Sequence, residues 1–225
     1  MSASIAVAKF HFSTEGTMKN LLMATLALAM MTLVSCSSEP AKPAQAEKPQ
    51  PKPTEFQTGR VAFQKMFIAA HGWGRDAQPY RLESQLTADC KGRDGKADLW
   101  RASFASTVQR GVKPYMWSGT DSSDAPSRGI SPGTEDAYNP NNSSTQVFDL
   151  NFLKVDSDKA FEIAQKHGGD KLLEGSPDTP VLYMLDWSRA TNTLIWHTIY
   201  GNSRDEAKLI VDVNATSGEF IRVEK

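Results

Sequence analysis

The sequence has few cysteines and no excess of basic residues, and each of these absences excludes a class of protein. Only two of the 225 residues, Cys36 and Cys90, are cysteines, which is too few for a framework of disulfides. The 25 lysines and arginines are balanced by 26 aspartates and glutamates, so no basic excess favours a nucleic-acid partner. We therefore expect a folded domain held together by its hydrophobic core, with no nucleic acid as ligand.

Metal-binding motifs are also missing. The sequence has no Cys-x-x-Cys and no His-x-x-x-His, and the segment 121–124 lacks the glycine and glutamate of a calcium loop. Residues 72–77 match the Gly-x-Gly-x-x-Ala dinucleotide fingerprint, but they follow an expected helix and precede Pro79, so a bound phosphate would meet no helix N-terminus. We expect no metal and no cofactor.

No long hydrophobic run of transmembrane length is present either. The apolar run covers only residues 21–34, whereas a membrane-spanning helix needs roughly 20 apolar residues. Lys19 precedes the run and Cys36 follows it, which is the arrangement of a signal peptide. Met18 gives a more compact signal than Met1, so either methionine remains open as the true start.

Residues 33–36, Leu-Val-Ser-Cys, resemble the bacterial lipobox. The resemblance implies cleavage of residues 1–35 and lipidation of Cys36, and several acyl chains would give stable membrane anchoring. An ordinary signal peptide with a coincidental cysteine is the alternative. Ser37, in place of an aspartate, favours the outer membrane, with the protein facing the periplasm.

Residues 36–57 are rich in proline, lysine and glutamate and poor in core residues, which predicts a tether. Proline-rich chain favours polyproline II at ~3.1 Å per residue, so this tether would reach roughly 65 Å from the membrane. Such a spacer is useful if the folded body must reach a partner.

An internal repeat organises the rest of the chain. Apolar residues at helical spacing follow Ala62-Phe63 and Ala160-Phe161, and a Trp-x-x-x-aromatic pattern follows each helix, at Trp100 and at Trp196. The helices are expected to end at residues 71–72 and 168–169. Strands are expected at residues 80–86, 99–104 and 113–117, and again at 181–185, 194–200, 209–213 and 220–223.

Short connections between these strands predict antiparallel neighbours. The fold class is therefore α+β, with two tandem helix-on-antiparallel-sheet units at residues 58–155 and 156–225. The segment 119–146 is rich in Gly, Pro, Ser and Asn and predicts a long loop, disordered or functional. Alternation in residues 147–153 predicts one extra strand that completes the first unit.

The second unit resembles the PepSY family of extracytoplasmic modules. The residues that carry the resemblance are 160–164 in the helix, Trp196 with Tyr200, and the stretch 210–220, which resembles the closing strand and hairpin of the family. The resemblance implies a non-catalytic module for binding, inhibition or sensing in the cell envelope, with no catalytic residues to assign.

Single residues that could carry chemistry have simpler interpretations. A nucleophile, a base and a group that orients the base could be assembled from the serines, the aspartates, His71, His167 and His197, as in most proteins of this size. His197 alternates with Ile195 within a strand, which favours a histidine on the surface of the sheet. Cys90 lies in a glycine-rich turn without a second cysteine, which favours a plain turn residue.

Tryptophans are better indicators of a binding function. Trp100 and Trp196 are expected in the core because they occupy repeat positions, whereas Trp73, Trp117 and Trp187 are candidates for an exposed partner-binding face. We expect a membrane-anchored lipoprotein that binds or regulates an envelope protein or peptide without catalysis. An envelope hydrolase acting on peptidoglycan or polysaccharide, and a passive structural lipoprotein, are the alternatives.

Overall fold

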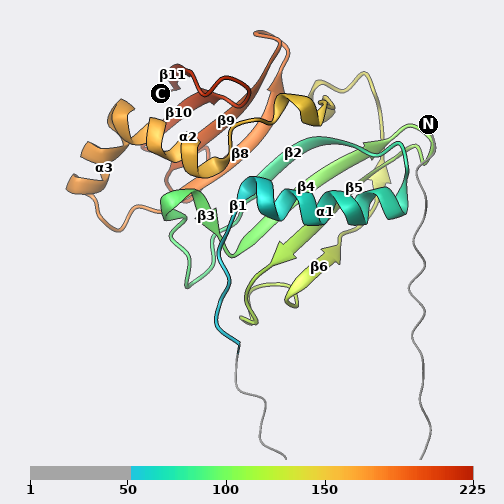
Figure 1. Cartoon of the computed structure of the whole chain (residues 1–225), viewed down its shortest axis with the longest axis horizontal. Helices are drawn as coiled ribbons and strands as arrows, with labels where there is room; N and C mark the ends of the chain where they lie inside the picture. The colour runs from blue at the N-terminus through green and yellow to red at the C-terminus, as the bar shows by residue number, and fades with distance from the viewer. Residues whose placement is uncertain (1–51, 225) are drawn as a thin grey trace, which may run out of the picture. The chain divides into compact units, whose positions relative to one another are not determined.

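The computed structural model describes residues 52–224, and the signal peptide, Cys36 and most of the tether lie outside this range. Nine strands form one sheet in the order β11-β10-β9-β8-β2-β4-β5-β6, with β7 also paired to β5 (Figure 1). Every pairing in this sheet is antiparallel. No helix in residues 52–224 is long and apolar enough to cross a membrane. The strands are β2 (Gln78–Ser84), β4 (Leu99–Ser106), β5 (Gly111–Ser118), β6 (Gly129–Pro132), β7 (Asp136–Ala137), β8 (Val181–Ser188), β9 (Thr193–Tyr200), β10 (Leu209–Asn214) and β11 (Phe220–Glu224).

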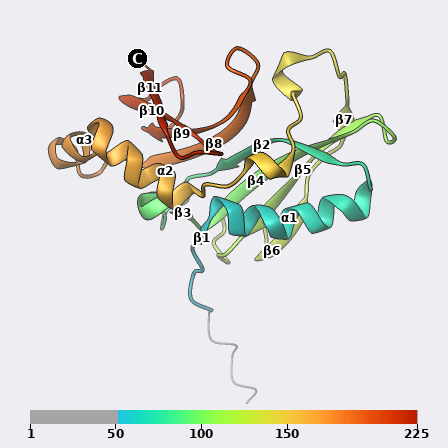
Figure 2. The same cartoon turned by 45° about the horizontal axis from the view of Figure 1, so that its top comes forward.

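The helices lie on one face of this sheet (Figure 2). Helix α1 (Gly59–Trp73) packs on β4 and β5, and α2 (Ser157–Ala164) packs on β9 and β10. After α2 the chain forms a π-turn (Gln165–Gly169) and a short α3 (Asp170–Gly175). A small second sheet pairs β1 (Gln57–Thr58) with β3 (Lys96–Ala97), next to a 3-10 turn (Arg93–Gly95).

The α+β class is confirmed, but the strands are not divided into one sheet per unit. Strand β2 pairs with β8, with Arg81 opposite Asp186 and Leu82 opposite Leu185, so the sheet is continuous. Outward from this central pair, each half adds its own strands in chain order. Apart from the strand expected at residues 147–153, the expected helices and strands are present, and they are joined by a β2–β8 pairing that the sequence did not predict.

The core lies between the helices and the sheet. Trp100 on β4 and Trp196 on β9 are both fully buried, and their rings meet edge to face at 6.5 Å between centroids. Each indole N–H donates to a backbone oxygen just before a helix, Trp100 to Gln57 at 3.0 Å and Trp196 to Val155 at 2.9 Å. The prediction that both tryptophans occupy the core is confirmed.

Close packing at this point requires a glycine. A Cβ atom on Gly59 would lie 2.7 Å from the Trp196 ring and 3.0 Å from the Trp100 ring. Helix α1 therefore begins with its first residue pressed against both indoles. Further along α1, Phe63, Met66 and Ala70 are buried and Phe67 is half-buried, in agreement with the apolar residues expected at helical spacing after Ala62-Phe63.

Two expectations about the segment between the halves are wrong. Residues 147–153 form no strand: the Asp149 carboxylate accepts from the Asn151 N–H and starts a 3-10 turn (Leu150–Phe152). The neighbouring strand β2 already has partners on both sides, so no edge is open to an added strand there. The loop 119–146 is partly built into the sheet, because β6 and β7 both pair with β5.

The second helix was expected to end at residues 168–169. The structure shows an interruption of the helix there. His167 and Gly168 leave helical geometry, and Gly168 has a φ of 111°, which glycine adopts without steric cost. The chain then resumes helical geometry in α3 instead of ending there.

Candidate functional site

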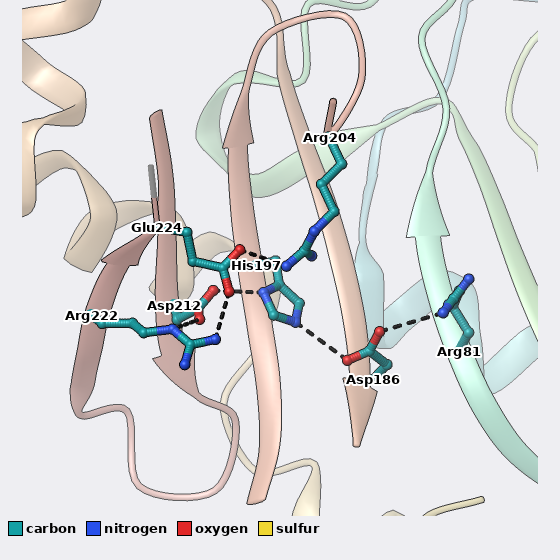
Figure 3. A network of polar contacts seen from close by, with 7 residues as sticks. All are labelled: Arg81, Asp186, His197, Arg204, Asp212, Arg222 and Glu224. Atoms are coloured by element: carbon teal, nitrogen blue, oxygen red, sulfur yellow. Dashed lines mark hydrogen bonds and ion pairs between the residues drawn. The ribbon is translucent and has the colours of Figure 1, made fainter. Parts of the chain in front are cut away.

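A charged network occupies the sheet face opposite the helices. His197 follows the buried Trp196 in β9, and successive strand residues point to opposite faces, so its imidazole lies on the face away from α1 and α2. Asp212 on β10 is its cross-strand neighbour, and Asp186 comes from β8 on the other side. Figure 3 shows the imidazole held between these two carboxylates.

Both ring nitrogens of His197 face carboxylate oxygens. Nδ1 lies 2.6 Å from Asp212 Oδ1 and Nε2 lies 3.3 Å from Asp186 Oδ1. An ionised carboxylate only accepts hydrogen bonds, so the imidazole satisfies both contacts only when both nitrogens carry a proton. Burial lowers the pKa of His197, but the hydrogen bonds and charges of Asp186 and Asp212 outweigh burial and raise it above the ordinary 6.5. The geometry and the pKa both favour the imidazolium.

Arginines neutralise the carboxylates from outside. Arg222 Nε lies 2.9 Å from Asp212 Oδ2, and its Nη2 lies 2.6 Å from Glu224 Oε1. Arg204 holds the other oxygen of Glu224 at 2.6 Å, and Arg81 lies 3.6 Å from Asp186. The seven residues drawn in Figure 3 therefore form a nearly charge-balanced network.

The two aspartates stay ionised within this network. Burial raises the pKa of Asp212, but the hydrogen bond and charge of His197, together with Arg222, lower it by more. For Asp186 burial is again opposed by His197 and Arg81, and the pKa is lowered overall. Neither carboxyl group therefore holds a proton near neutral pH that it could donate to a substrate.

Three groups of the metal-ligand type also meet here. Ligand atoms of His197, Asp212 and Glu224 lie within 4.8 Å of one another. However, Arg222 bridges the two carboxylates, so a guanidinium occupies the position that favours a cation. A protonated His197 cannot ligate a metal either, because both nitrogens lack a free lone pair. The residues present fit an internal ion network better than a metal centre.

Sequence reasoning placed His197 on the sheet surface and missed the network. The imidazole is on the sheet, but it is only 5% exposed. One signal was available: His197 and Asp212 are polar residues directly beside core residues within two expected strands, and Asp186 directly follows a third, 181–185. That pattern predicts that the three side chains lie on one face of the sheet, but it does not predict which of them are neighbours across the strands.

One motif was missed altogether. Residues 129–133, Gly-Ile-Ser-Pro-Gly, have the Gly-x-Ser-x-Gly pattern of a nucleophile elbow. In the structure Ser131 lies in the edge strand β6, opposite Met116 of β5, and not at a turn from a strand into a helix. The structural context that would make this serine a nucleophile is therefore not met.

The three candidate tryptophans contact different sets of side chains. Trp117 is 3% exposed, so its expected place on an exposed face is wrong; its ring packs against Gly119 and carries the Lys65 ammonium 4.9 Å from its centroid. Trp73 is half-buried and donates to Glu135 at 2.9 Å. Trp187 is half-buried against Phe152 at 5.0 Å between centroids. Trp73 and Trp187 remain candidates at two separate places.

Cys90 is a buried free thiol. Its sulfur accepts from the Gly92 N–H at 3.3 Å, and burial is the main cause that raises its pKa. A raised pKa disfavours the reactive thiolate, which agrees with the interpretation of a turn residue.

Comparison with known proteins identifies a similar fold but no family. No family model matches this chain, and no curated protein matches it. A solved structure of a candidate lipoprotein from Clostridium difficile 630 is 13% identical, with a TM-score of 0.50, and the match covers 75% of this chain and 95% of that chain. At this identity the similarity shows a shared α+β fold alone. The resemblance to PepSY modules remains a hypothesis.

Proposed function

We propose that this protein is a lipoprotein of the bacterial cell envelope, anchored through Cys36 to the outer membrane and facing the periplasm. Its folded body acts as a non-catalytic module that binds an envelope protein or peptide. Supporting the anchor are the lipobox-like residues 33–36 and the similarity of fold to a candidate lipoprotein. We also propose that the two halves are tandem PepSY-like units, which the mirrored strand order on either side of the β2–β8 pair supports.

The observation that carries the binding function is the outer strand β11. In the described part of the chain it pairs only with β10, so one side of its backbone has no partner there. Phe220 and Val223 are 37% and 42% exposed along the same strand. An open strand edge with exposed apolar side chains is suited to receive an extended peptide as an added strand.

The opposite edge is less suited to this role. Strand β6 has four residues and ends in Pro132, which has no N–H to donate. Strand β11 contains no proline. The partner is therefore expected at the C-terminal edge of the sheet.

The charged network supports binding without catalysis. Both nitrogens of His197 are engaged by carboxylates, so neither is free to take a proton from a nucleophile. The lowered pKa values of Asp186 and Asp212 leave no protonated carboxyl to act as a general acid on a glycosidic bond. The network instead ties β8, β9, β10 and β11 together beneath the proposed binding edge.

The test is capture of the partner from detergent-solubilised membranes by the lipidated protein. Val223→Lys places a charge on the exposed edge, which opposes strand addition, and should abolish recovery of a defined companion. Val108→Lys is the matched control, because Val108 is 75% exposed in the turn between β4 and β5, and it should retain the companion. Equal recovery with both variants would contradict the proposal. Turnover of peptidoglycan, abolished by His197→Gln, would support a hydrolase instead.

A further inference from the structure

Helix α1 borders a groove that the proposed function does not use. The segment 148–154, which leads into α2, passes alongside α1 (Figure 2), and a pocket of about 400 Å³ lies between them. This volume is within the ~300–1,000 Å³ of ordinary ligand pockets. The groove is on the helix side of the sheet, away from the charged network. Its lining residues are Arg60, Phe63, Gln64, Phe67, Ile68, Leu150 and Leu153.

The walls of the groove are apolar. Phe63 and Leu153 are 2% and 5% exposed, while Phe67 and Leu150 are half-buried. Ile68 is 74% exposed and stands at the rim. A large aliphatic side chain this exposed beside a hydrophobic pocket leaves apolar surface in water that a ligand could cover.

The first pocket has a cationic side chain and no acidic one in its lining. Helix α1 carries Arg60, Lys65 and His71 and no acidic residue. Lys65 is paired with Glu55 at 3.5 Å. Arg60 makes no ion pair within residues 52–224, and its guanidinium has only a 3.4 Å contact with the Lys154 carbonyl. A guanidinium without an ion-pair partner in the described residues therefore lies at one end of an apolar channel, and the Asp156 carboxylate beside it accepts from the Arg60 backbone N–H.

A second pocket continues the first. It has a volume of about 440 Å³, shares Phe67 and Leu150 with the first, and reaches His71 and Arg75 near the end of α1. Asp76 and Asp149 also line this second pocket and accept hydrogen bonds from neutral donors, Asp76 from Ser106 at 2.7 Å and Asp149 from the Asn151 N–H at 2.8 Å. The apolar path thus extends along the helix from Arg60 to an end of mixed charge, which leaves Arg60 as the position suited to an anionic head group.

Backbone groups along the groove are already bonded. The N–H groups of Phe148, Phe152 and Leu153 donate to the carbonyls of Pro79, Asp149 and Leu150 respectively. At the start of α1, the N–H groups of Gly59 and Arg60 donate to the side chains of Ser157 and Asp156. An extended peptide bound here would bury its own N–H and C=O groups without partners, which costs free energy. An alkyl chain has no such groups to satisfy.

We propose that this groove binds a free single-chain amphiphile with an anionic head group, of the fatty-acid type. The chain lies on Phe63, Phe67, Leu150 and Leu153, and the head group pairs with Arg60. This site is independent of the strand β11, so the module would sense or carry a lipid product while it binds its protein partner at the sheet edge.

The probe is laurate, used below its micelle concentration. The protein is the full mature chain with Cys36→Ser, which removes the lipid attachment point and with it the need for detergent. Calorimetric titration should show saturable binding of one laurate, and dodecanol, which has the same chain without the charge, should bind about tenfold more weakly because a charge-assisted contact is lost.

Variants separate the head-group contact from the rest of the helix. Arg60→Gln should weaken laurate binding about tenfold and leave dodecanol unchanged. Lys65→Gln is the matched control on the same helix, since Lys65 faces Glu55 and Trp117, and should bind laurate normally. Ile68→Glu places a carboxylate at the rim and should abolish binding of laurate, and its exposed position spares the fold.

Four results would overturn the proposal: no saturable laurate binding, equal affinities for laurate and dodecanol, an equal loss with Arg60→Gln and Lys65→Gln, or binding to anionic vesicles alone. Tight binding of an acidic amphipathic helix with no binding of laurate would assign the groove to a peptide instead. Val223→Lys should leave laurate binding unchanged, so failure at this site and failure at the sheet edge are distinguishable.

Discussion

One carboxylate caps two helices, and its removal gives the sharpest test of how the halves of this protein are joined. Asp156 is the N-cap of α2 and accepts from Ser157 N–H at 2.7 Å. The same side chain accepts from Arg60 N–H at 2.8 Å and from the Thr58 hydroxyl at 2.7 Å, at the start of α1. Thr58 itself, the N-cap residue of α1, makes no side-chain cap hydrogen bond.

The expected cost of Asp156→Ala follows from these contacts. A lost N-cap costs ~1 kcal/mol, and a carboxylate at a helix N-terminus adds ~0.3–1 kcal/mol. Both helix ends lose both contributions, so the free energy of unfolding should fall by about 2.6–4 kcal/mol. Urea denaturation followed by circular dichroism measures this value.

Two matched variants sharpen the test. Asp158→Ala removes an exposed carboxylate from the first turn of α2 that accepts only from Lys159 N–H, and it should cost under ~1 kcal/mol. Asp156→Asn keeps a good N-cap side chain and should lose roughly 1 kcal/mol, because the charge goes but a cap oxygen remains. If Asp156→Ala costs no more than Asp158→Ala, the shared cap does not join the two helices as described.

Three further predictions concern the core, the charged network and the anchor. Trp100→Ala and Trp196→Ala should each lower the free energy of unfolding by about 3–5 kcal/mol, whereas Val108→Ala, at an exposed turn, should change it by no more than about 0.5 kcal/mol. Similarly small losses at all three positions would refute the assignment of the two tryptophans to equivalent core positions. Because the folded pKa of His197 lies above its unfolded value, its ion pairs stabilise fully below about pH 6.5 and lose this contribution as pH rises through the folded pKa. The stability difference between the wild type and His197→Gln should therefore shrink on titration from about pH 6 to 9, and a difference that grows with pH would be incompatible with this network. Mass spectrometry of the mature N-terminal peptide should show a lipidated Cys36, and an unmodified N-terminus or cleavage at any other bond would refute the anchor.

Local pattern was sufficient for most of the elements. The apolar spacing in residues 63–70 predicted α1, and the alternating runs predicted β2, β4, β5 and β8 to β11 to within a few residues. The repeat positions predicted that Trp100 and Trp196 are buried. These features depend on side chains near in sequence, whose periodicity is set by the helix and strand geometry itself.

The errors share a different origin. Residues 147–153 alternate like a strand, but a strand forms only where an edge is open, and β2 is paired on both sides. Trp117 lies outside the tryptophan positions of the repeat, yet it is 3% exposed. In both cases the outcome depended on neighbours that are distant along the chain.

The candidate site depended on tertiary structure still more. The sequence by itself determined that His197 and Asp212 lie in strands, whereas the strand expected at 181–185 stopped one residue short of Asp186. Only the register of β9 against β8 and β10 brought the three side chains together, as only the docking of two helix ends brought Arg60 to Asp156. Strand register and helix docking are fixed by packing over the whole core, because a shift of one residue turns every side chain of a strand to the other face.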